Sequence, residues 1–163
     1  LEAIHRASLE VLRTTGIDML HPGARRLLAA AGAEVDGERV RFDPALVESL
    51  LSSAPRQFTL HGRRPNRDLT IGGDWVTFSS VASAPNIVDR AGGRRAGSRA
   101  DYRTLLRLCQ MLNIIHTVGG YPVEPIDLHA SIRHLEATWD ALTIMDKPFH
   151  VYSLGRQRNL DAI

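Results

Sequence analysis

Cysteine and lysine are almost absent from this sequence of 163 residues. The one cysteine, Cys109, excludes an internal disulfide and a cysteine-based zinc site within the chain. It lies on the apolar stripe of an expected helix, so it is interpreted as a small buried hydrophobic residue, in keeping with a cytoplasmic protein. No apolar run approaches the roughly 20 residues that a membrane helix needs, so no membrane span is expected. The first residues also lack the basic head and apolar stretch of a secretory signal.

Only one of the 20 basic residues is lysine, and the other nineteen are arginine, yet the formal net charge is just +2. Several arginines gather between residues 63 and 99, an arrangement that would suit nucleic acid. The cluster has no interleaved aromatic residues on which bases could stack, and it falls in expected turns. Solvated loops are therefore the favoured interpretation, and no nucleic-acid partner is expected.

The first part of the chain, residues 1–98, is predicted to be an extension of helices and small antiparallel β-structure. Apolar spacing, prolines and glycines indicate helices over residues 1–15, 22–31 and 43–54, with a hairpin over residues 35–42. The period then shortens, and residues 57–61, 68–71 and 75–78 are expected to be short strands, separated by glycine-containing turns. Residues 81–88 are expected to be extended, followed by a turn at residues 91–93.

The remaining part, residues 99–163, has the alternation of strands and helices that is typical of a parallel α/β sheet. Ser98 and Asp101 predict a capping box that opens a helix to residue 113. An apolar strand over residues 114–118, a loop, a helix carrying Trp139, a second strand over residues 148–153 and the start of another helix follow. A (β/α)₈ barrel takes about 250 residues, so we expect the first βα units of a TIM barrel in a larger enzyme, not a complete enzyme. The strands at residues 114–118 and 149–152 are predicted to be parallel neighbours.

Five segments, read together and in order, resemble one known family. They are residues 4–12 with Gly16 and Ile17, residues 58–63, residues 68–73, residues 119–125 (Gly-Gly-Tyr-Pro-Val-Glu-Pro) and residues 146–150 (Asp-Lys-Pro-Phe-His). Together they resemble the N-terminal portion of the trimethylamine methyltransferase family, which includes glycine betaine methyltransferases. The run at residues 79–86 departs from the glycine- and proline-rich pattern of that family.

The resemblance implies a fold, a reaction and two partners. The fold is a TIM barrel preceded by a helical and β-rich extension. The reaction moves a methyl group from a methylated amine to the cobalt of a corrinoid that a partner protein carries, so no cofactor is expected to bind this chain directly. Some members of the family use pyrrolysine at a position that lies beyond residue 163, and this chain says nothing about it.

Four residues are candidates for substrate binding, because functional groups of barrels lie at the carboxyl ends of strands. A methylated ammonium favours aromatic faces and a nearby carboxylate, which Tyr121, Tyr152 and Glu124 would supply. His150 would add a hydrogen-bonding group. Each has a plainer alternative: the tyrosines as packing residues, Glu124 as a surface carboxylate, and His150, like His116, as a buried core histidine. No histidine pair has metal-ligand spacing, so no metal site is expected.

Two further possibilities stay open. The chain would be a non-catalytic structural or interaction module if it acts alone, or part of another cofactor-dependent barrel enzyme. An unpaired apolar strand edge attracts a second chain, so a homo-oligomer is also expected, through Phe149, Val151 or the stripe formed by Ile132, Trp139 and Leu142.

Overall fold

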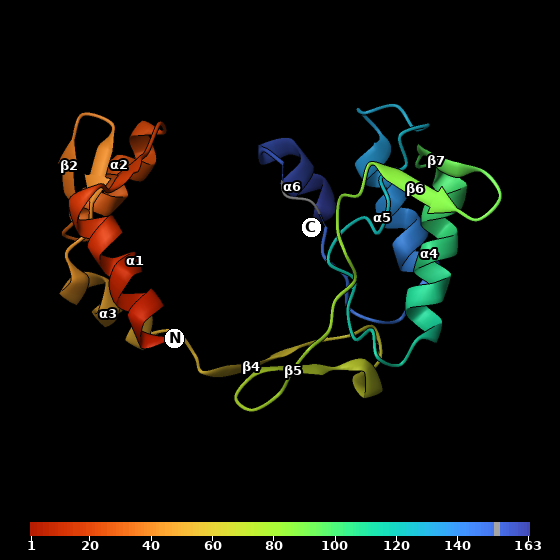
Figure 1. The fold of residues 1–163 in the computed structure, drawn as a ribbon, viewed down its shortest axis with the longest axis horizontal. Coiled ribbons are helices and arrows are strands. Elements are labelled where there is room, and N and C mark those ends of the chain that lie inside the picture. The colour runs from red at the N-terminus through yellow and green to blue at the C-terminus, as the bar shows by residue number, and fades with distance from the viewer. Residues whose placement is uncertain (152–153) are drawn as a thin grey trace. The chain divides into compact units, whose positions relative to one another are not determined.

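The structure, a computed structural model, describes residues 1–151 and 154–163. These residues form two compact units, Leu1–Pro55 and Arg56–Ile163, which are described separately (Figure 1). The expected division of the chain into an extension over residues 1–98 and barrel units over residues 99–163 stays a prediction.

The first unit combines three helices with a small antiparallel sheet in the strand order β1-β3-β2. Its elements are α1 (Glu2–Thr14), β1 (Ile17–Asp18), α2 (Pro22–Ala30), β2 (Glu34–Asp36), β3 (Arg39–Arg41) and α3 (Pro44–Ser52). Helices α2 and α3 each begin with a proline that follows a capping residue. The capping side chains accept backbone hydrogen bonds, Nδ1 of His21 from the N–H of Ala24 and the carboxylate of Asp43 from the N–H of Ala45. The three predicted helices and the hairpin are confirmed, whereas strand β1 was not predicted.

Val40 is the centre of this unit, with 0% of its surface exposed. Gly16 passes so close to it that a Cβ atom at residue 16 would lie 2.4 Å from the carbonyl oxygen of Val40. Gly16 also has a φ of 70°, which side chains other than glycine rarely adopt. Glycine is therefore required where the chain leaves α1 and enters the sheet.

The second unit begins with two antiparallel hairpins. Strand β4 (Gln57–Leu60) pairs with β5 (Leu69–Gly72) around the short 3₁₀ turn η1 (Pro65–Arg67), and β6 (Asn86–Asp89) pairs with β7 (Gly93–Ala96). The strands predicted at residues 57–61 and 68–71 are confirmed. The strand predicted at residues 75–78 is wrong, because this segment joins no antiparallel pair.

Residues 78–80 instead lie beside residues 116–118 in the parallel direction. The N–H groups of His116 and Thr117 donate to the oxygen of Phe78, and the N–H of Ser80 donates to the oxygen of Thr117. On the other side, a parallel bridge joins Val118 to Phe149. The predicted parallel pairing of the two later segments is confirmed, although it is an isolated bridge and not a full ladder. The earlier parallel neighbour was not predicted.

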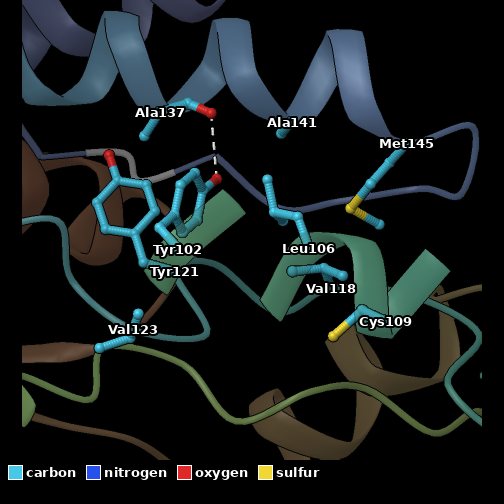
Figure 2. Close-up of a cluster of buried hydrophobic side chains, with 9 residues drawn as sticks. All are labelled: Tyr102, Leu106, Cys109, Val118, Tyr121, Val123, Ala137, Ala141 and Met145. Atoms are coloured by element: carbon cyan, nitrogen blue, oxygen red, sulfur yellow. Dashed lines mark hydrogen bonds between the residues drawn. The ribbon is translucent and has the colours of Figure 1, made fainter. Parts of the chain in front are cut away.

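Two helices pack against these parallel segments and form the main core (Figures 1 and 2). They are α4 (Arg99–Met111) and α5 (Arg133–Ile144), and a shorter helix, α6 (Arg156–Ala162), follows. The nine buried residues of the core are Tyr102, Leu106, Cys109, Val118, Tyr121, Val123, Ala137, Ala141 and Met145. Alanines on α5 let the two helices approach closely, and the hydroxyl of Tyr102 donates to the oxygen of Ala137 at 3.1 Å.

The start of α4 is fixed by charge as well as by packing. Ser98 and Asp101 form the predicted capping box, and Arg95 of β7 donates twice to the carboxylate of Asp101, at 2.6 and 2.7 Å. Hydrogen bonds from Arg95 first, and then from Ser98, hold the pKa of Asp101 well below its usual range. The hairpin β6–β7 is thereby tied to the first turn of the helix.

Asp140 of α5 carries a charge into the interface between the two helices, where its exposure is 0%. Arg99 donates to both carboxylate oxygens, at 2.7 and 3.0 Å, and Arg103 donates at 2.8 Å. Both arginines are partly exposed, so they bring the compensating charge from the surface to the buried carboxylate. Breaking such a pair by removing one partner is far more costly than losing a surface ion pair.

Lys147, the single lysine, closes the other end of α4. Its Nζ donates to the carbonyl oxygens of Cys109, Leu112 and Ile115, at 2.6, 2.9 and 2.7 Å. Cations stabilise the carboxyl end of a helix, where carbonyl groups lack partners within the helix. Burial lowers the pKa of this ammonium group, and the nearby charge of Arg67 lowers it further.

The described residues therefore form a mixed α/β fold with small antiparallel sheets and short parallel pieces, and these do not close into a barrel. The apolar stripe of α5 faces away from the core: Trp139 is 64% exposed, and Ile132, Leu135 and Leu142 are exposed too. Association of two chains through this stripe stays a prediction. Among the residues that the structure describes, no helix is both long and apolar enough to cross a bilayer.

The Asp140 cluster gives a test of what holds the two helices together. Asp140→Asn should lower the free energy of unfolding by about 3 kcal/mol, because two guanidinium groups lose their buried acceptor. Urea unfolding measures this change. Glu136→Gln is the matched control, since Glu136 pairs with the same Arg99 at 2.7 Å but is partly exposed. It should cost less than about 1 kcal/mol, and equal costs for the two variants would contradict a buried anchor.

Candidate functional site

The parallel segments end around a cavity of about 280 Å³. Ser83 follows the segment 78–80 by three residues, Tyr121 follows 116–118 by three, and Leu154 follows 148–150 by four. All three residues line the cavity, together with Glu124, Ala130, Arg133, His134 and Arg158. A site at the carboxyl ends of parallel strands is the usual place for chemistry in α/β proteins. The volume is just below the roughly 300–1,000 Å³ of small-molecule sites, so it suits a small ligand.

Ser83 adopts a strained backbone conformation on the cavity wall. Its φ is 61°, and it is the one non-glycine residue with a positive φ among the described residues. The conformation is held by a hydrogen bond of 2.8 Å from the N–H of Ser83 to the oxygen of Tyr121. Such residues gather at ligand sites, where the surrounding structure compensates for the strain. The bond also couples the loops that follow two of the parallel segments.

Tyr121 belongs both to the cavity and to the core. It is 7% exposed, and its ring meets the ring of Tyr102 edge to face, with centroids 5.6 Å apart and an interplanar angle of 79° (Figure 2). The packing interpretation and the ligand interpretation are therefore compatible: the ring is fixed by Tyr102, and part of it lines the cavity. A ring held this way offers a preorganised surface to a cation.

Glu124 is not an isolated carboxylate. Its Oε1 accepts from Arg133 at 2.9 Å, and the same guanidinium donates to the carbonyl oxygens of Leu128 and Ile126, at 2.9 and 3.4 Å. Arg133 thus holds the loop between Glu124 and α5 in place and is fully engaged by it. The second carboxylate oxygen, Oε2, makes no hydrogen bond within the described part of the chain, so it stays available to a ligand.

His134 is the buried polar residue of the cavity, with 8% of its surface exposed. Its Nε2 lies 2.8 Å from Oδ2 of Asp161 on α6, while its Nδ1 has no hydrogen-bond partner in residues 1–151 and 154–163. The hydrogen bond from His134 first, and that from Gln157 second, lower the pKa of Asp161, so this carboxylate is ionised and acts as an acceptor. Nε2 therefore carries the hydrogen, and Nδ1 is left for a ligand.

Arg158 brings the remaining charge. It is partly buried, and in the described part of the chain its guanidinium meets one acceptor, the oxygen of Ala130 at 3.3 Å. It pairs with no carboxylate there. The charged groups on the cavity wall are therefore the carboxylate of Glu124 and the guanidinium groups of Arg133 and Arg158. The carboxylate of Glu124 already neutralises the charge of Arg133.

Two of the four residues predicted from the sequence, Tyr121 and Glu124, meet in this cavity. His150 does not line it and is exposed, so the interpretation of a buried core histidine is wrong for this residue; its N–H donates to the oxygen of Val118. His116 is partly buried, and its Nδ1 accepts from the N–H of Phe78 at 3.0 Å. Tyr152 lies outside the described residues.

Sequence reasoning missed Ser83, Arg133, His134 and Arg158. The last three follow a signal that was available, because each lies in the first turn of a helix that comes after a strand. In a parallel α/β fold those turns border the same edge as the strand ends. Within the described residues, no group of three or more histidine, cysteine or acidic side chains has an arrangement that would hold a metal ion.

Comparison with known proteins settles the family. The sequence matches the family described as Trimethylamine methyltransferase (MTTB) over residues 1–163. The chain belongs to the trimethylamine methyltransferase family. It is 32% identical to a glycine betaine methyltransferase of Desulfitobacterium hafniense (strain Y51) over 163 residues, which are 100% of this chain and 34% of that relative.

Two trimethylamine methyltransferases named MttB are also similar. That of Desulfitobacterium hafniense (strain DSM 10664 / DCB-2) is 33% identical over 135 residues, 81% of this chain and 27% of the relative. That of Methanosarcina thermophila is 40% identical over 65 residues, 39% of this chain and 14% of the relative. The chain spans about a third, or less, of the curated relatives it matches, and it corresponds to their N-terminal portion.

The strain at Ser83 can be tested in this member of the trimethylamine methyltransferase family. Ser83→Gly should leave the free energy of unfolding unchanged or raise it by up to about 1 kcal/mol, because glycine adopts a positive φ without a steric penalty. Ala84→Gly is the control and should lower it by about 0.5–1 kcal/mol. Thermal unfolding compares the two, and equal losses would show that residue 83 carries no strain.

Proposed function

We propose that the protein containing this chain moves a methyl group from a tertiary or quaternary methylated amine to a corrinoid carried by a partner protein. Membership of the trimethylamine methyltransferase family supports the class of reaction. The observation that carries the proposal is the cavity at the carboxyl ends of the parallel segments, with Tyr121 and Glu124 on its wall. We infer further that the protein acts in the cytoplasm, in keeping with its single, unpaired cysteine.

The proposed architecture is the first part of a TIM barrel. The parallel neighbours at residues 78–80, 116–118 and 148–150, with α5 between the last two, support a sheet that continues in the same direction. On this proposal residues 99–163 supply the first βα units, and the extension over residues 1–98 contributes the segment 78–80 as a further parallel neighbour. The carboxyl ends of those segments would then lie at the mouth of the barrel, where barrel enzymes bind their substrates.

A methylated ammonium ion suits the wall formed by Tyr121 and Glu124. The ring offers an aromatic surface, and the Oε2 atom of the carboxylate offers partial neutralisation of the charge. Because Arg133 fixes Glu124 and Tyr102 fixes Tyr121, neither group has to be ordered when the ligand arrives. Preorganised contacts reduce the entropic cost of binding.

The corrinoid does not fit the same cavity. A corrin macrocycle is much larger than a space of about 280 Å³, so the residues of this cavity suit the amine and not the cofactor. On this proposal a partner protein would carry the corrinoid. When present, a reduced corrinoid would supply the nucleophile that accepts the methyl group, while the residues of this chain bind and orient the amine.

A non-catalytic interaction role is the second candidate. The observation in its favour is the exposed apolar stripe of α5, formed by Ile132, Leu135, Trp139 and Leu142. Large exposed apolar surfaces mark places where another chain or domain docks. A homo-oligomer would cover this stripe, and so would further parts of the same enzyme.

The role of Tyr121 can be separated from its packing by a pair of substitutions. Tyr121→Leu should lower kcat/KM for methylated amines by roughly tenfold or more, because the ammonium loses an aromatic contact. Tyr102→Phe is the matched control: it keeps the ring that packs on Tyr121 and removes the buried hydroxyl that donates to the oxygen of Ala137. The assay follows methyl transfer from a panel of methylated amines to a reduced corrinoid.

Both variants should lose stability, but only Tyr121→Leu should raise KM. Equal effects of the two on KM would assign Tyr121 to packing alone. Lack of methyl transfer from every amine of the panel by the wild-type protein would refute the proposed reaction and favour the interaction role. Residues 1–163 alone should not catalyse transfer, because they supply only part of the proposed barrel mouth.

A further inference from the structure

A second cavity lies at the amino ends of the parallel segments, where Lys147 precedes the segment 148–150 and His116 opens the segment 116–118. We call it the lysine cavity. Its volume is about 150 Å³, and its polar lining residues are Asn66, Arg67, Asp68, Asn113, His116 and Lys147. This volume is more than one water molecule needs and less than the roughly 300–1,000 Å³ of sites for larger molecules, so it suits a small ion.

The ammonium group of Lys147 is a buried charge on the wall of this cavity. Lys147 is 5% exposed, and Nζ donates to three carbonyl oxygens, of Cys109, Leu112 and Ile115. In residues 1–151 and 154–163 its partners are therefore carbonyl groups, which carry partial charges only, and no carboxylate. Buried charges in proteins are normally paired with an opposite charge, so this position favours an anion beside it.

Arg67 brings a second positive charge to the lysine cavity. Its Nε lies 3.0 Å from Oδ1 of Asp146, but without the alignment of a hydrogen bond. The same carboxylate accepts from Gln110 at 2.6 Å and lies 3.9 Å from Arg64. Two guanidinium groups thus share one carboxylate, and the Nη atoms of Arg67 make no hydrogen bond within the described part of the chain. They are available to a ligand.

His116 offers a hydrogen-bond donor in a fixed position. Its Nδ1 accepts from the N–H of Phe78 at 3.0 Å, and its own backbone N–H donates to the oxygen of Phe78 at 2.9 Å. The two rings also stack, with centroids 6.0 Å apart. Because Nδ1 is an acceptor, the hydrogen of the neutral ring is on Nε2. No described residue accepts from Nε2, so this N–H is available without any further protonation of the ring.

The carboxylate of Asp68 does not cancel these charges at the cavity. One of its oxygens accepts from the N–H of Gly62, and the other lies 2.9 Å from Nδ1 of His61. The hydrogen bond from Gly62 first, and that from His61 second, lower the pKa of Asp68, so both oxygens are committed to the hairpin. The lining therefore has two positive groups and one carboxylate that is already engaged.

We propose that Arg67, His116 and Lys147 form a binding site for a phosphate group. The guanidinium of Arg67 and Nε2 of His116 donate to the phosphate oxygens, and Lys147 contributes its charge without donating. A doubly charged tetrahedral group suits this set better than a planar carboxylate, because the donors come from separate segments and two positive charges lie beside them. The inference is independent of the proposed methyl transfer, since this cavity and the one around Tyr121 share no lining residue.

A neighbouring cavity distinguishes a free phosphate ion from a phosphate ester. It has a volume of about 260 Å³ and shares Asp68, Leu69 and His116 with the lysine cavity. Its wall also includes Trp75, which is 70% exposed. The organic group of an ester would pack against this ring, whereas a free ion would leave the neighbouring cavity unused.

Isothermal titration calorimetry tests the site with inorganic phosphate and the whole protein that contains this chain, at constant ionic strength and in a buffer without oxyanions. Arg67→Gln should raise the Kd roughly tenfold or more, as expected for the loss of a charge-assisted hydrogen bond. Arg64→Gln is the matched control, because Arg64 lies beside the same Asp146 but does not line the lysine cavity. It should change the Kd less than about threefold, since an exposed charge is screened.

Two substitutions of His116 examine its two nitrogens separately. Asparagine places an oxygen near the position of Nδ1 and keeps the acceptor for Phe78, but it has no donor at Nε2. Glutamine does the reverse. His116→Asn should therefore raise the Kd for phosphate about three- to tenfold with little change in Tm, whereas His116→Gln should retain more affinity and have a lower Tm. A merely structural role of His116 would produce losses of affinity that follow the losses in Tm.

The source of the phosphate follows from a second ligand, phenyl phosphate. A lower Kd for phenyl phosphate than for inorganic phosphate assigns the site to an ester, and the opposite order assigns it to the free ion. The site is overturned if neither ligand binds saturably, if acetate binds more tightly than both, if Arg67→Gln and Arg64→Gln lose affinity equally, or if the Kd is unchanged in both Arg67→Gln and His116→Asn. Circular dichroism verifies that each variant folds.

Discussion

The buried carboxylate of Asp140 is the interaction on which the second unit depends. It joins α4 to α5 through Arg99 and Arg103 at a point where the carboxylate itself is buried. Since a lone buried charge is costly, the two helices have one low-energy arrangement, in which both guanidinium groups reach Asp140. The alanines at positions 137 and 141 then pack against α4, and the core closes around Leu106.

The position of α5 determines the cavity. Arg133 and His134 lie in the first turn of that helix, so they are placed at the carboxyl ends of the parallel segments by the contacts that Asp140 makes two turns later. Lys147 fixes the opposite end of α4 and the entry into the segment 148–150, away from the cavity. The buried contacts of Asp140 and Lys147 thus stabilise the packing of the helices, whereas Arg133 and His134 line the cavity.

Much of the fold could be predicted because local signals were strong. Pro22, Pro44 and the pair Ser98 and Asp101 mark helix starts by the chemistry of capping, which acts within a few residues of sequence. The same reasoning failed at residues 75–78, where a short strand was predicted. Their partner, Thr117, is far away in sequence, and no local pattern distinguishes a parallel neighbour from a hairpin strand.

In the candidate site, too, local sequence signals were predictive and contacts between distant residues were not. Tyr121 and Glu124 were accessible to sequence reasoning because they come directly after a strand. The places of Arg158 and His134 could have been expected from the first turns of their helices, but the hydrogen bond from His134 to Asp161, 27 residues away, could not. Glu124 was identified, but its pairing with Arg133 could not be, since an arginine on the surface and one that braces a loop have the same sequence signature. Which charged side chains of this site pair with each other therefore depends on contacts that form only in the folded chain.

We propose that the carboxyl ends of the parallel segments bind the methylated amine. A crystal structure of the protein containing this chain, soaked with a quaternary methylated amine, tests it most directly. The ammonium nitrogen should lie within about 6 Å of the Tyr121 ring, the range of a cation–π contact. An amine bound elsewhere, with the cavity around Tyr121, Glu124 and His134 holding only water, would contradict it.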